Sequence, residues 1–151
     1  MTALRPLRIL IVEDEALISM DLEYVLEDLG HEIVGVAASS DTAMRLASEH
    51  KPDLAFVDIQ LLDGPTGVDV AAALARESVT KVVFTSGNVN RIPPDYAGAV
   101  GSIGKPYSER GVKAAISYLT KGLLTPPPDE NAPPSLTLAP EFQNRWSGSS
   151  A

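Results

Sequence analysis

Short apolar runs alternate with segments of helical periodicity from residue 8 to residue 121, and this alternation leaves few possible folds. Each run is apolar almost without interruption, as in strands that are buried on both faces of a sheet. Strands that alternate with helices favour an α/β fold with an open, doubly wound, five-stranded parallel sheet. The predicted strands span residues 8–12, 32–36, 53–57, 81–85 and 100–103.

Four helices are predicted between and after these strands. In the first, Ile18, Leu22 and Val25 recur at the spacing of one helix face, and Gly30 ends the pattern. Residues 87–98 have two prolines and no helical period, so we predict a loop of low local stability there. The predicted helices span residues 15–29, 40–49, 67–76 and 108–121.

Chemically reactive side chains follow the ends of four predicted strands. Glu13 and Asp14 come after the first strand and Asp58 after the third. Ser86 follows the fourth strand and Lys105 the fifth. In open parallel sheets, ligands bind beyond the carboxyl ends of the strands. Three carboxylates, a hydroxyl and an amine would therefore share one pocket, which suits a divalent cation and a phosphoryl group.

Four motifs lie at these strand ends: IVEDE at residues 11–15, LAFVDI at 54–59, VVFTSG at 82–87 and GKPY at 104–107. Together and in this order they resemble the receiver domain of two-component response regulators, the CheY-like family. The resemblance covers about residues 7–121. It implies a flavodoxin-like (βα)5 fold with strand order 2-1-3-4-5.

The resemblance also implies reversible phosphorylation of Asp58 by a sensor histidine kinase or a histidine phosphotransfer protein. A carboxylate can attack the phosphorus of a phosphohistidine and form an aspartyl-phosphate. The resemblance further implies that Mg²⁺ binds Asp14, Asp58 and the main-chain carbonyl of Gln60, with Glu13 acting through a water. Clustered carboxylates favour such a cation because their like charges oppose one another.

Two further site residues are expected to contact the phosphoryl group: Lys105 as a point charge and Ser86 through its hydroxyl. Thr85 is a rival for the hydroxyl role, although side-chain alternation along the strand favours Ser86. The residue three positions before the lysine, often aromatic in receivers, is Ser102 here. The usual aromatic switch is therefore absent, and we place the conformational switch in the loop 87–98.

The sequence FTSGN at residues 84–88 partly matches the motif of the FAT-GUY type of receiver. Only 19 positions separate Ser86 from Lys105, which is also short for a receiver. FAT-GUY receivers occur in α-proteobacteria as stand-alone proteins and pair with HWE or HisKA2 kinases. The resemblance therefore implies a kinase partner of that kind.

The first helix carries a second apolar stripe made of Leu17, Met20 and Tyr24. One interpretation is that these side chains pack against the last helix. The other is that they are exposed and form a docking surface for the helical phosphotransfer domain of a kinase, as the family resemblance implies.

Residues 122–151 hold six of the twelve prolines, together with much Ser, Asn and Gly. This composition predicts a flexible C-terminal tail after a receiver domain of residues 1–121. Phe142 and Trp146 lie one helical turn apart, so the alternative is that this pair docks on the domain or on a partner.

Composition excludes several classes of protein. The net charge of −8 disfavours a nucleic-acid partner, and the lack of cysteine excludes disulfides and thiol chemistry. No apolar run approaches about 20 residues, so we expect no membrane partner and a cytoplasmic location. His31 and His50 are expected to be turn or cap residues and not metal ligands.

We therefore interpret the chain as a phosphoacceptor regulatory protein and not as an enzyme with its own substrate. It would signal through protein–protein contacts, without an output domain of its own. One alternative is a phosphate-independent interaction module with the same fold. Another is a phosphohydrolase with an aspartate nucleophile, but haloacid-dehalogenase-like hydrolases need an acid two residues after the nucleophile, where this chain has Gln60.

Overall fold

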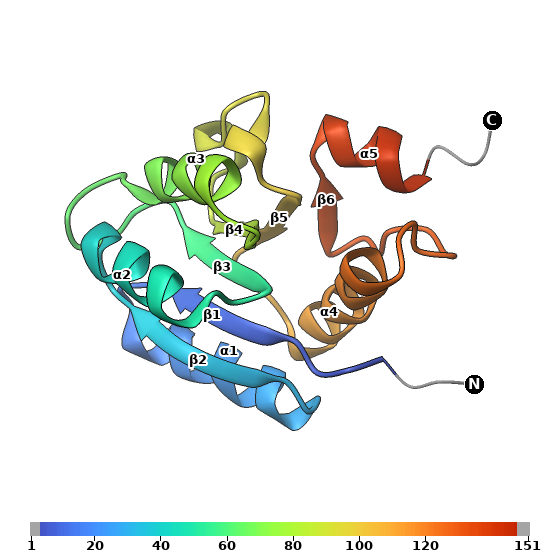
Figure 1. Ribbon diagram of the computed structural model, residues 1–151, viewed down its shortest axis with the longest axis horizontal. Coiled ribbons are helices and arrows are strands. Elements are labelled where there is room, and N and C mark those ends of the chain that lie inside the picture. The colour runs from blue at the N-terminus through green and yellow to red at the C-terminus, as the bar shows by residue number, and fades with distance from the viewer. Residues whose placement is uncertain (1–3, 148–151) are drawn as a thin grey trace.

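The computed structural model describes residues 4–147, which form one six-stranded sheet with helices on both faces (Figure 1). The strand order is β2-β1-β3-β4-β5-β6, so the first five strands have the predicted order. The strands are β1 (Arg8–Val12), β2 (Glu32–Ala37), β3 (Leu54–Asp58), β4 (Lys81–Ser86), β5 (Gly101–Gly104) and β6 (Leu136–Leu138). The helices are α1 (Ala16–Asp28), α2 (Ser40–His50), α3 (Gly67–Glu77), α4 (Glu109–Leu124) and α5 (Pro140–Ser147), with the short 3-10 helices η1 (Val89–Arg91) and η2 (Tyr96–Gly98).

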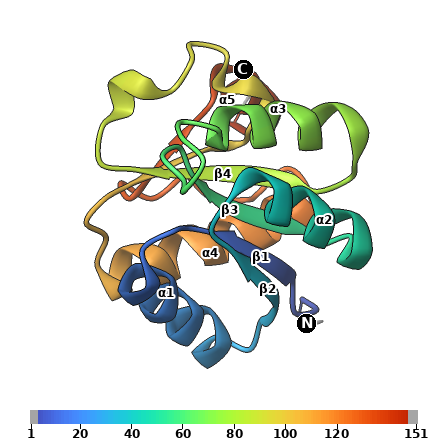
Figure 2. The same cartoon turned by 90° about the vertical axis from the view of Figure 1, so that its left-hand side faces the viewer.

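Aliphatic side chains of β1 alternate between the two faces of the sheet. Ile9 and Ile11 belong to the core that α1 and α4 cover, whereas Leu10 and Val12 belong to the core under α2 and α3 (Figure 2). This alternation is the two-residue period of a strand. All four side chains are fully buried, and each such burial stabilises the fold by roughly 1.5–3 kcal/mol. The residues that follow β1 are therefore held on a rigid support.

The segment between β4 and β5 contains η1 and η2 but no α-helix, as predicted. Three consecutive residues of this loop, Tyr96, Ala97 and Gly98, have positive φ angles of 56°, 49° and 84°. The side chain of Asp95 accepts a hydrogen bond of 2.9 Å from the Ala97 amide and supports this turn. Left-handed backbone costs roughly 1–2 kcal/mol for each residue other than glycine. The loop is thus a strained connection between two buried strands.

The sheet contains six strands, one more than predicted. Residues Leu136–Leu138 form β6, which pairs antiparallel with β5 and places Thr137 opposite Ser102. The two strands approach closely at Gly101, where a Cβ atom would lie 2.3 Å from the carbonyl oxygen of Thr137. A three-residue strand in a proline-rich segment has too few residues for a detectable period, so its pairing depends on tertiary contact.

The chain beyond α4 folds back on the sheet, which differs from the predicted flexible tail. Phe142 and Trp146 of α5 are buried, and their ring centroids lie 5.1 Å apart in an edge-to-face contact. Trp146 also contacts the ring of Tyr118 in α4 at 5.8 Å. It covers Gly122, where a Cβ atom would lie 2.4 Å from the indole. These two aromatics hold the tail on the domain.

Candidate functional site

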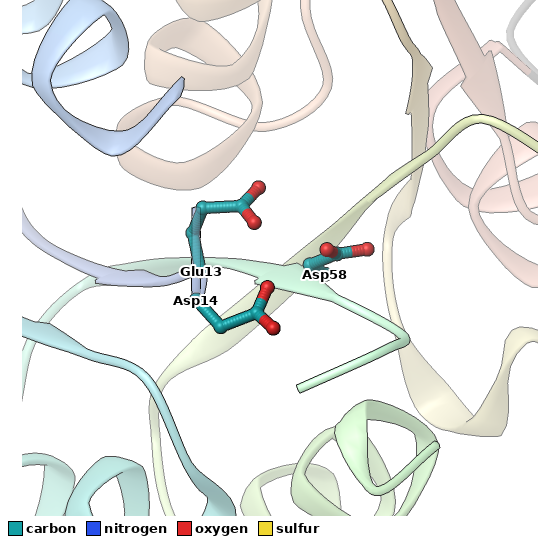
Figure 3. A group of neighbouring side chains, drawn as sticks. All are labelled: Glu13, Asp14 and Asp58. Atoms are coloured by element: carbon teal, nitrogen blue, oxygen red, sulfur yellow. The ribbon is translucent and has the colours of Figure 1, made fainter. Parts of the chain in front are cut away.

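Three acidic side chains meet at the carboxyl ends of β1 and β3. Glu13 and Asp14 directly follow β1, and Asp58 is the last residue of β3 (Figure 3). Glu13 and Asp58 are buried, whereas Asp14 is half-buried. One carboxylate oxygen of each lies within 4.8 Å of the others. The structure therefore brings together the three predicted acids from two strands, of which one ends at Val12 and the other begins at Leu54.

This cluster suits a divalent cation. Mg²⁺ prefers carboxylate and carbonyl oxygens, and three carboxylates at this separation repel one another unless a cation lies among them. Glu13, Asp14 and Asp58 could therefore hold a metal ion. Gln60 lies two residues beyond Asp58 and is exposed, and the role of its main-chain carbonyl as a further ligand stays a prediction.

Lys105 reaches this cluster from the loop that follows β5. Its Nζ donates to Glu13 Oε1 at 2.6 Å and to Asp58 Oδ2 at 3.1 Å. The backbone amide of Lys105 donates to the carbonyl of Ser86 at 2.9 Å, which fixes the start of its loop beside β4. The lysine is thus anchored at both ends, and its ammonium bridges two of the three acids.

Burial and ion pairing shape the charges in this site. Burial raises the pKa of Glu13 above its ordinary value, and the hydrogen bond from Lys105 offsets only part of that effect. For Lys105, burial opposes the charged form, but the hydrogen bonds and charges of Glu13 and Asp58 outweigh it and raise the pKa. The lysine therefore stays a cation.

The two residues with candidate hydroxyls, Thr85 and Ser86, are the last two residues of β4. Ser86 Oγ donates to the carbonyl of Asn88 and accepts from its amide, both at 3.0 Å. Thr85 is buried and lies opposite Asp58 in the register of β3 and β4. Ser102 is buried on β5, opposite Phe84. The hydroxyl of Ser86 is thus bound to the first residues of the loop 87–98.

Gly67, the first residue of α3, is a positioning residue outside the set of site residues predicted from the sequence. A Cβ atom at this position would lie 2.0 Å from the carbonyl oxygen of Asp58. The amide of Gly67 donates to the carbonyl of Ile59 at 2.9 Å. The start of α3 therefore presses directly on the backbone that carries Asp58, and only glycine allows that approach.

A cavity of about 750 Å³ lies between α1 and the start of α4, next to Lys105. Tyr107 lines it, and the hydroxyl of this tyrosine is buried without a hydrogen-bond partner among the residues that the structure describes. Burial raises the pKa of Tyr107, and the negative charges of Glu13 and Asp58 add to the effect. Tyr107 therefore stays protonated, and its side chain is a neutral part of the lining of this cavity.

The apolar stripe on α1 is exposed, so the interpretation that it packs against the last helix is wrong. Leu17, Met20 and Tyr24 have exposed fractions of 78%, 61% and 66%. Tyr24 also lines the cavity beside Lys105. Tyr24 therefore belongs both to the exposed stripe and to the cavity beside Lys105.

A flavodoxin-like sheet with three acids and a lysine at its carboxyl edge defines the class of receiver proteins. The family model of the response regulator receiver domain matches residues 9–117, so the chain belongs to this family. The match ends within α4 and does not include β6 or α5.

Two curated relatives and one solved structure are similar over the same part of the chain. The phyllosphere-induced regulator PhyR of Methylorubrum extorquens is 40% identical over 111 residues, covering 72% of this chain and 42% of PhyR. The transcriptional regulatory protein PdtaR of Mycobacterium tuberculosis is 39% identical over 114 residues, covering 74% of this chain and 55% of PdtaR. The chain thus spans about half the length of these relatives. The solution structure of the receiver domain of Erythrobacter litoralis PhyR has a TM-score of 0.67 and 34% identity, covering 75% of this chain and 88% of that chain.

Proposed function

We propose that the chain is a phosphoacceptor of two-component signalling. Asp58 receives a phosphoryl group from a histidine kinase or a histidine phosphotransfer protein, with Mg²⁺ in the acidic cluster. The observation that carries the proposal is the contact of Lys105 Nζ with both Glu13 and Asp58 beside a third acid. This bridge supports the proposal, because it holds a cation beside the carboxylate that would carry the phosphoryl group.

The chemistry follows from these positions. A carboxylate oxygen of Asp58 attacks the phosphorus of a phosphohistidine, an O–P bond forms, the P–N bond breaks and the imidazole leaves. Asp14, Asp58 and the main-chain carbonyl of Gln60 would hold Mg²⁺, which would neutralise part of the phosphoryl charge. Lys105 exchanges its contacts with carboxylates for contacts with phosphoryl oxygens, and the hydroxyl of Ser86, or its rival Thr85, donates to the same group.

The phosphodonor docks on α1. Its Leu17, Met20 and Tyr24 are exposed, and Tyr24 also lines the cavity beside Lys105. A helix that packs on them would bring its histidine close to Asp58. The partial FAT-GUY motif favours a kinase of the HWE or HisKA2 type. The output is a protein–protein contact in the cytoplasm, with no nucleic acid or membrane as partner.

The conformational switch lies in the loop 87–98. Ser86 holds the backbone of Asn88 through two hydrogen bonds, and a hydroxyl that turns to a phosphoryl group gives up at least one of them. Ser102 offers no aromatic side chain for the alternative switch. Phosphorylation would therefore reshape this loop, a change of the order–disorder type. Equal amide exchange of residues 87–98 with and without the phosphoryl group would contradict this switch.

Incubation with acetyl phosphate and Mg²⁺, followed by intact mass spectrometry, tests the function. The wild type is expected to gain one phosphoryl group, and Asp58→Asn none, because the amide is not a nucleophile of this kind. The Asp58→Asn variant keeps the size of the side chain and so controls for changes in folding.

The same experiment separates the alternatives. No gain of mass in the wild type would favour a phosphate-independent interaction module. Multiple turnover of acetyl phosphate without a stable adduct would favour a phosphohydrolase. A pull-down that compares the phosphorylated wild type with Asp58→Asn then identifies partners that depend on phosphorylation.

A further inference from the structure

Arg91 is a cation without an anionic partner among the described residues, and its side chain contacts Gln60, two residues beyond Asp58. Among the arginines of residues 4–147, only Arg91 and Arg110 make no ion pair. Arg91 Nη2 donates to Gln60 Oε1 at 3.3 Å, which is long for a hydrogen bond. Both side chains are exposed. The guanidinium therefore lies on the segment that directly follows Asp58, with most of its donors free for another acceptor.

The backbone that carries Arg91 is linked to the hydroxyl at the end of β4. The carbonyl of Asn88 accepts hydrogen bonds from Ser86 Oγ at 3.0 Å and from the amide of Arg91 at 3.1 Å. The side chain of Asn88 accepts from the amide of Asn90 at 3.0 Å. Hydrogen bonds thus link Ser86 to Asn88, Asn88 to Arg91, and Arg91 to Gln60. Gln60 lies two residues after Asp58, so this series of contacts begins and ends next to the site. A rotation of the Ser86 hydroxyl removes one support of η1.

The charge balance of the phosphorylated site favours one further cation. The charges of the three carboxylates would be balanced by Lys105 together with a Mg²⁺ ion in the acidic cluster. Phosphorylation replaces the single negative charge of Asp58 with close to two, so about one negative charge is left over. Arginine is well suited to that charge, because its planar guanidinium can donate two parallel hydrogen bonds to phosphoryl oxygens.

We propose that Arg91 is a second phosphoryl-binding cation, which leaves Gln60 and closes over the phosphoryl group once Asp58 carries it. The proposal rests on the proposed function. It gives the switch in the loop 87–98 a definite contact: release of Asn88 by Ser86 frees η1, and the guanidinium holds the loop in its new position. The phosphoryl group is then bound by Lys105 from one side and by Arg91 from the other.

Titration with beryllofluoride, a tetrahedral mimic of the phosphoryl group, tests the proposal in the full chain at constant Mg²⁺. Amide signals in NMR spectra report the binding. Arg91→Gln is expected to weaken mimic binding about tenfold, because a hydrogen bond between charged groups is lost. Arg91→Lys is expected to fall between Arg91→Gln and the wild type, because it keeps the charge without the planar fork.

Arg110→Gln is the matched control, since Arg110 is also exposed and unpaired but lies on α4. It removes the same charge and is expected to bind the mimic as the wild type does. Mg²⁺ affinity without the mimic is a second readout, and Arg91→Gln is expected to leave it unchanged or slightly raised. Wild-type mimic affinity in Arg91→Gln, or an equal loss in Arg110→Gln, would overturn the proposal.

Failure of the proposed function gives a different result. In that case the wild type gains no phosphoryl group from acetyl phosphate and binds no beryllofluoride. If the wild type does both and Arg91→Gln matches it, only the role of Arg91 is wrong. Arg91 is exposed, so its substitution leaves the core intact, and thermal unfolding of each variant verifies this.

Discussion

The imidazole of His31 supports the start of the first strand and must be neutral to do so. Its Nδ1 accepts a hydrogen bond of 2.9 Å from the amide of Leu7, which is fully buried. Burial lowers the pKa of His31 below its ordinary value of 6.5. His31 lies directly after Gly30, in the connection between α1 and β2. A protonated ring could not accept this bond.

Acid is therefore expected to destabilise the protein through His31. Below pH 6.5 the unfolded chain binds a proton at this ring and the folded chain does not, so the free energy of unfolding falls as the pH falls. The contribution is complete above pH 6.5 and is lost as the pH drops below that value towards the lowered pKa. Urea unfolding between about pH 7.5 and pH 5 measures it.

His31→Gln is the control, because its side-chain oxygen can accept the same bond but does not titrate. The free energy of unfolding of this variant should depend less on pH between about pH 7.5 and pH 5. The wild type should lose more stability over this range, by on the order of 1 kcal/mol, the usual contribution of one hydrogen bond. If the free energy of unfolding falls equally with pH in both proteins, groups other than His31 cause the acid sensitivity.

At the residue scale, the positions of the reactive side chains could be predicted, because each one follows an apolar run that has to be a buried strand. The roles of Gly67 and Arg91 could not be predicted from the sequence. Gly67 is required by the carbonyl of Asp58, and Arg91 reaches Gln60 across 31 positions. Both roles depend on tertiary contacts between distant segments, and the spacing of residues along the sequence does not predict such contacts.

At the scale of elements, the C-terminal strand β6 and helix α5 pack on the rest of the domain through few contacts. This unit is held by the short ladder between β5 and β6 and by Phe142 and Trp146. Composition predicted a flexible segment, since six prolines and few apolar residues are typical of one. The prediction differs from the structure because two aromatic anchors and two leucines are enough to bury this segment against a preformed surface.

Phe142→Ala is expected to release this unit without unfolding the sheet. The buried ring contacts Trp146 at 5.1 Å, and loss of a buried phenylalanine costs about 3–5 kcal/mol, more than a unit of this size can lose. Trp146 is the sole tryptophan of the chain, so its fluorescence reports the release directly. Its emission should shift to the red while the far-ultraviolet circular dichroism stays close to that of the wild type.

Asn144→Ala is the matched control on the same helix, because this side chain is exposed. It should leave the emission of Trp146 unchanged. A red shift in both variants would mean that α5 is only weakly held, and simultaneous loss of fluorescence and circular dichroism in Phe142→Ala would mean that the tail and the sheet unfold as one.

At the scale of the whole molecule, the fold brings like charges together and thereby stores a repulsion that a metal ion can remove. The rule that ligands bind at the carboxyl edge of a parallel sheet predicted this meeting point from the order of strands and helices alone. The rule does not give the protonation or the ion pairing of the acids. Those depend on burial at the edge, where Glu13 is 4% and Asp58 8% exposed.

Mg²⁺ is therefore expected to stabilise the entire chain, by about 2.7 kcal/mol at a hundredfold excess over its dissociation constant. Asp14→Asn should lose most of this gain, because it removes one ligand of the cluster. Without Mg²⁺ the same variant should be more stable than the wild type, because one repulsive charge is gone. Thermal unfolding with and without MgCl₂, with NaCl at equal ionic strength as control, measures both effects. An equal gain from Mg²⁺ in both proteins would show that the ion acts elsewhere on this acidic chain, and not in the cluster that β1 and β3 assemble.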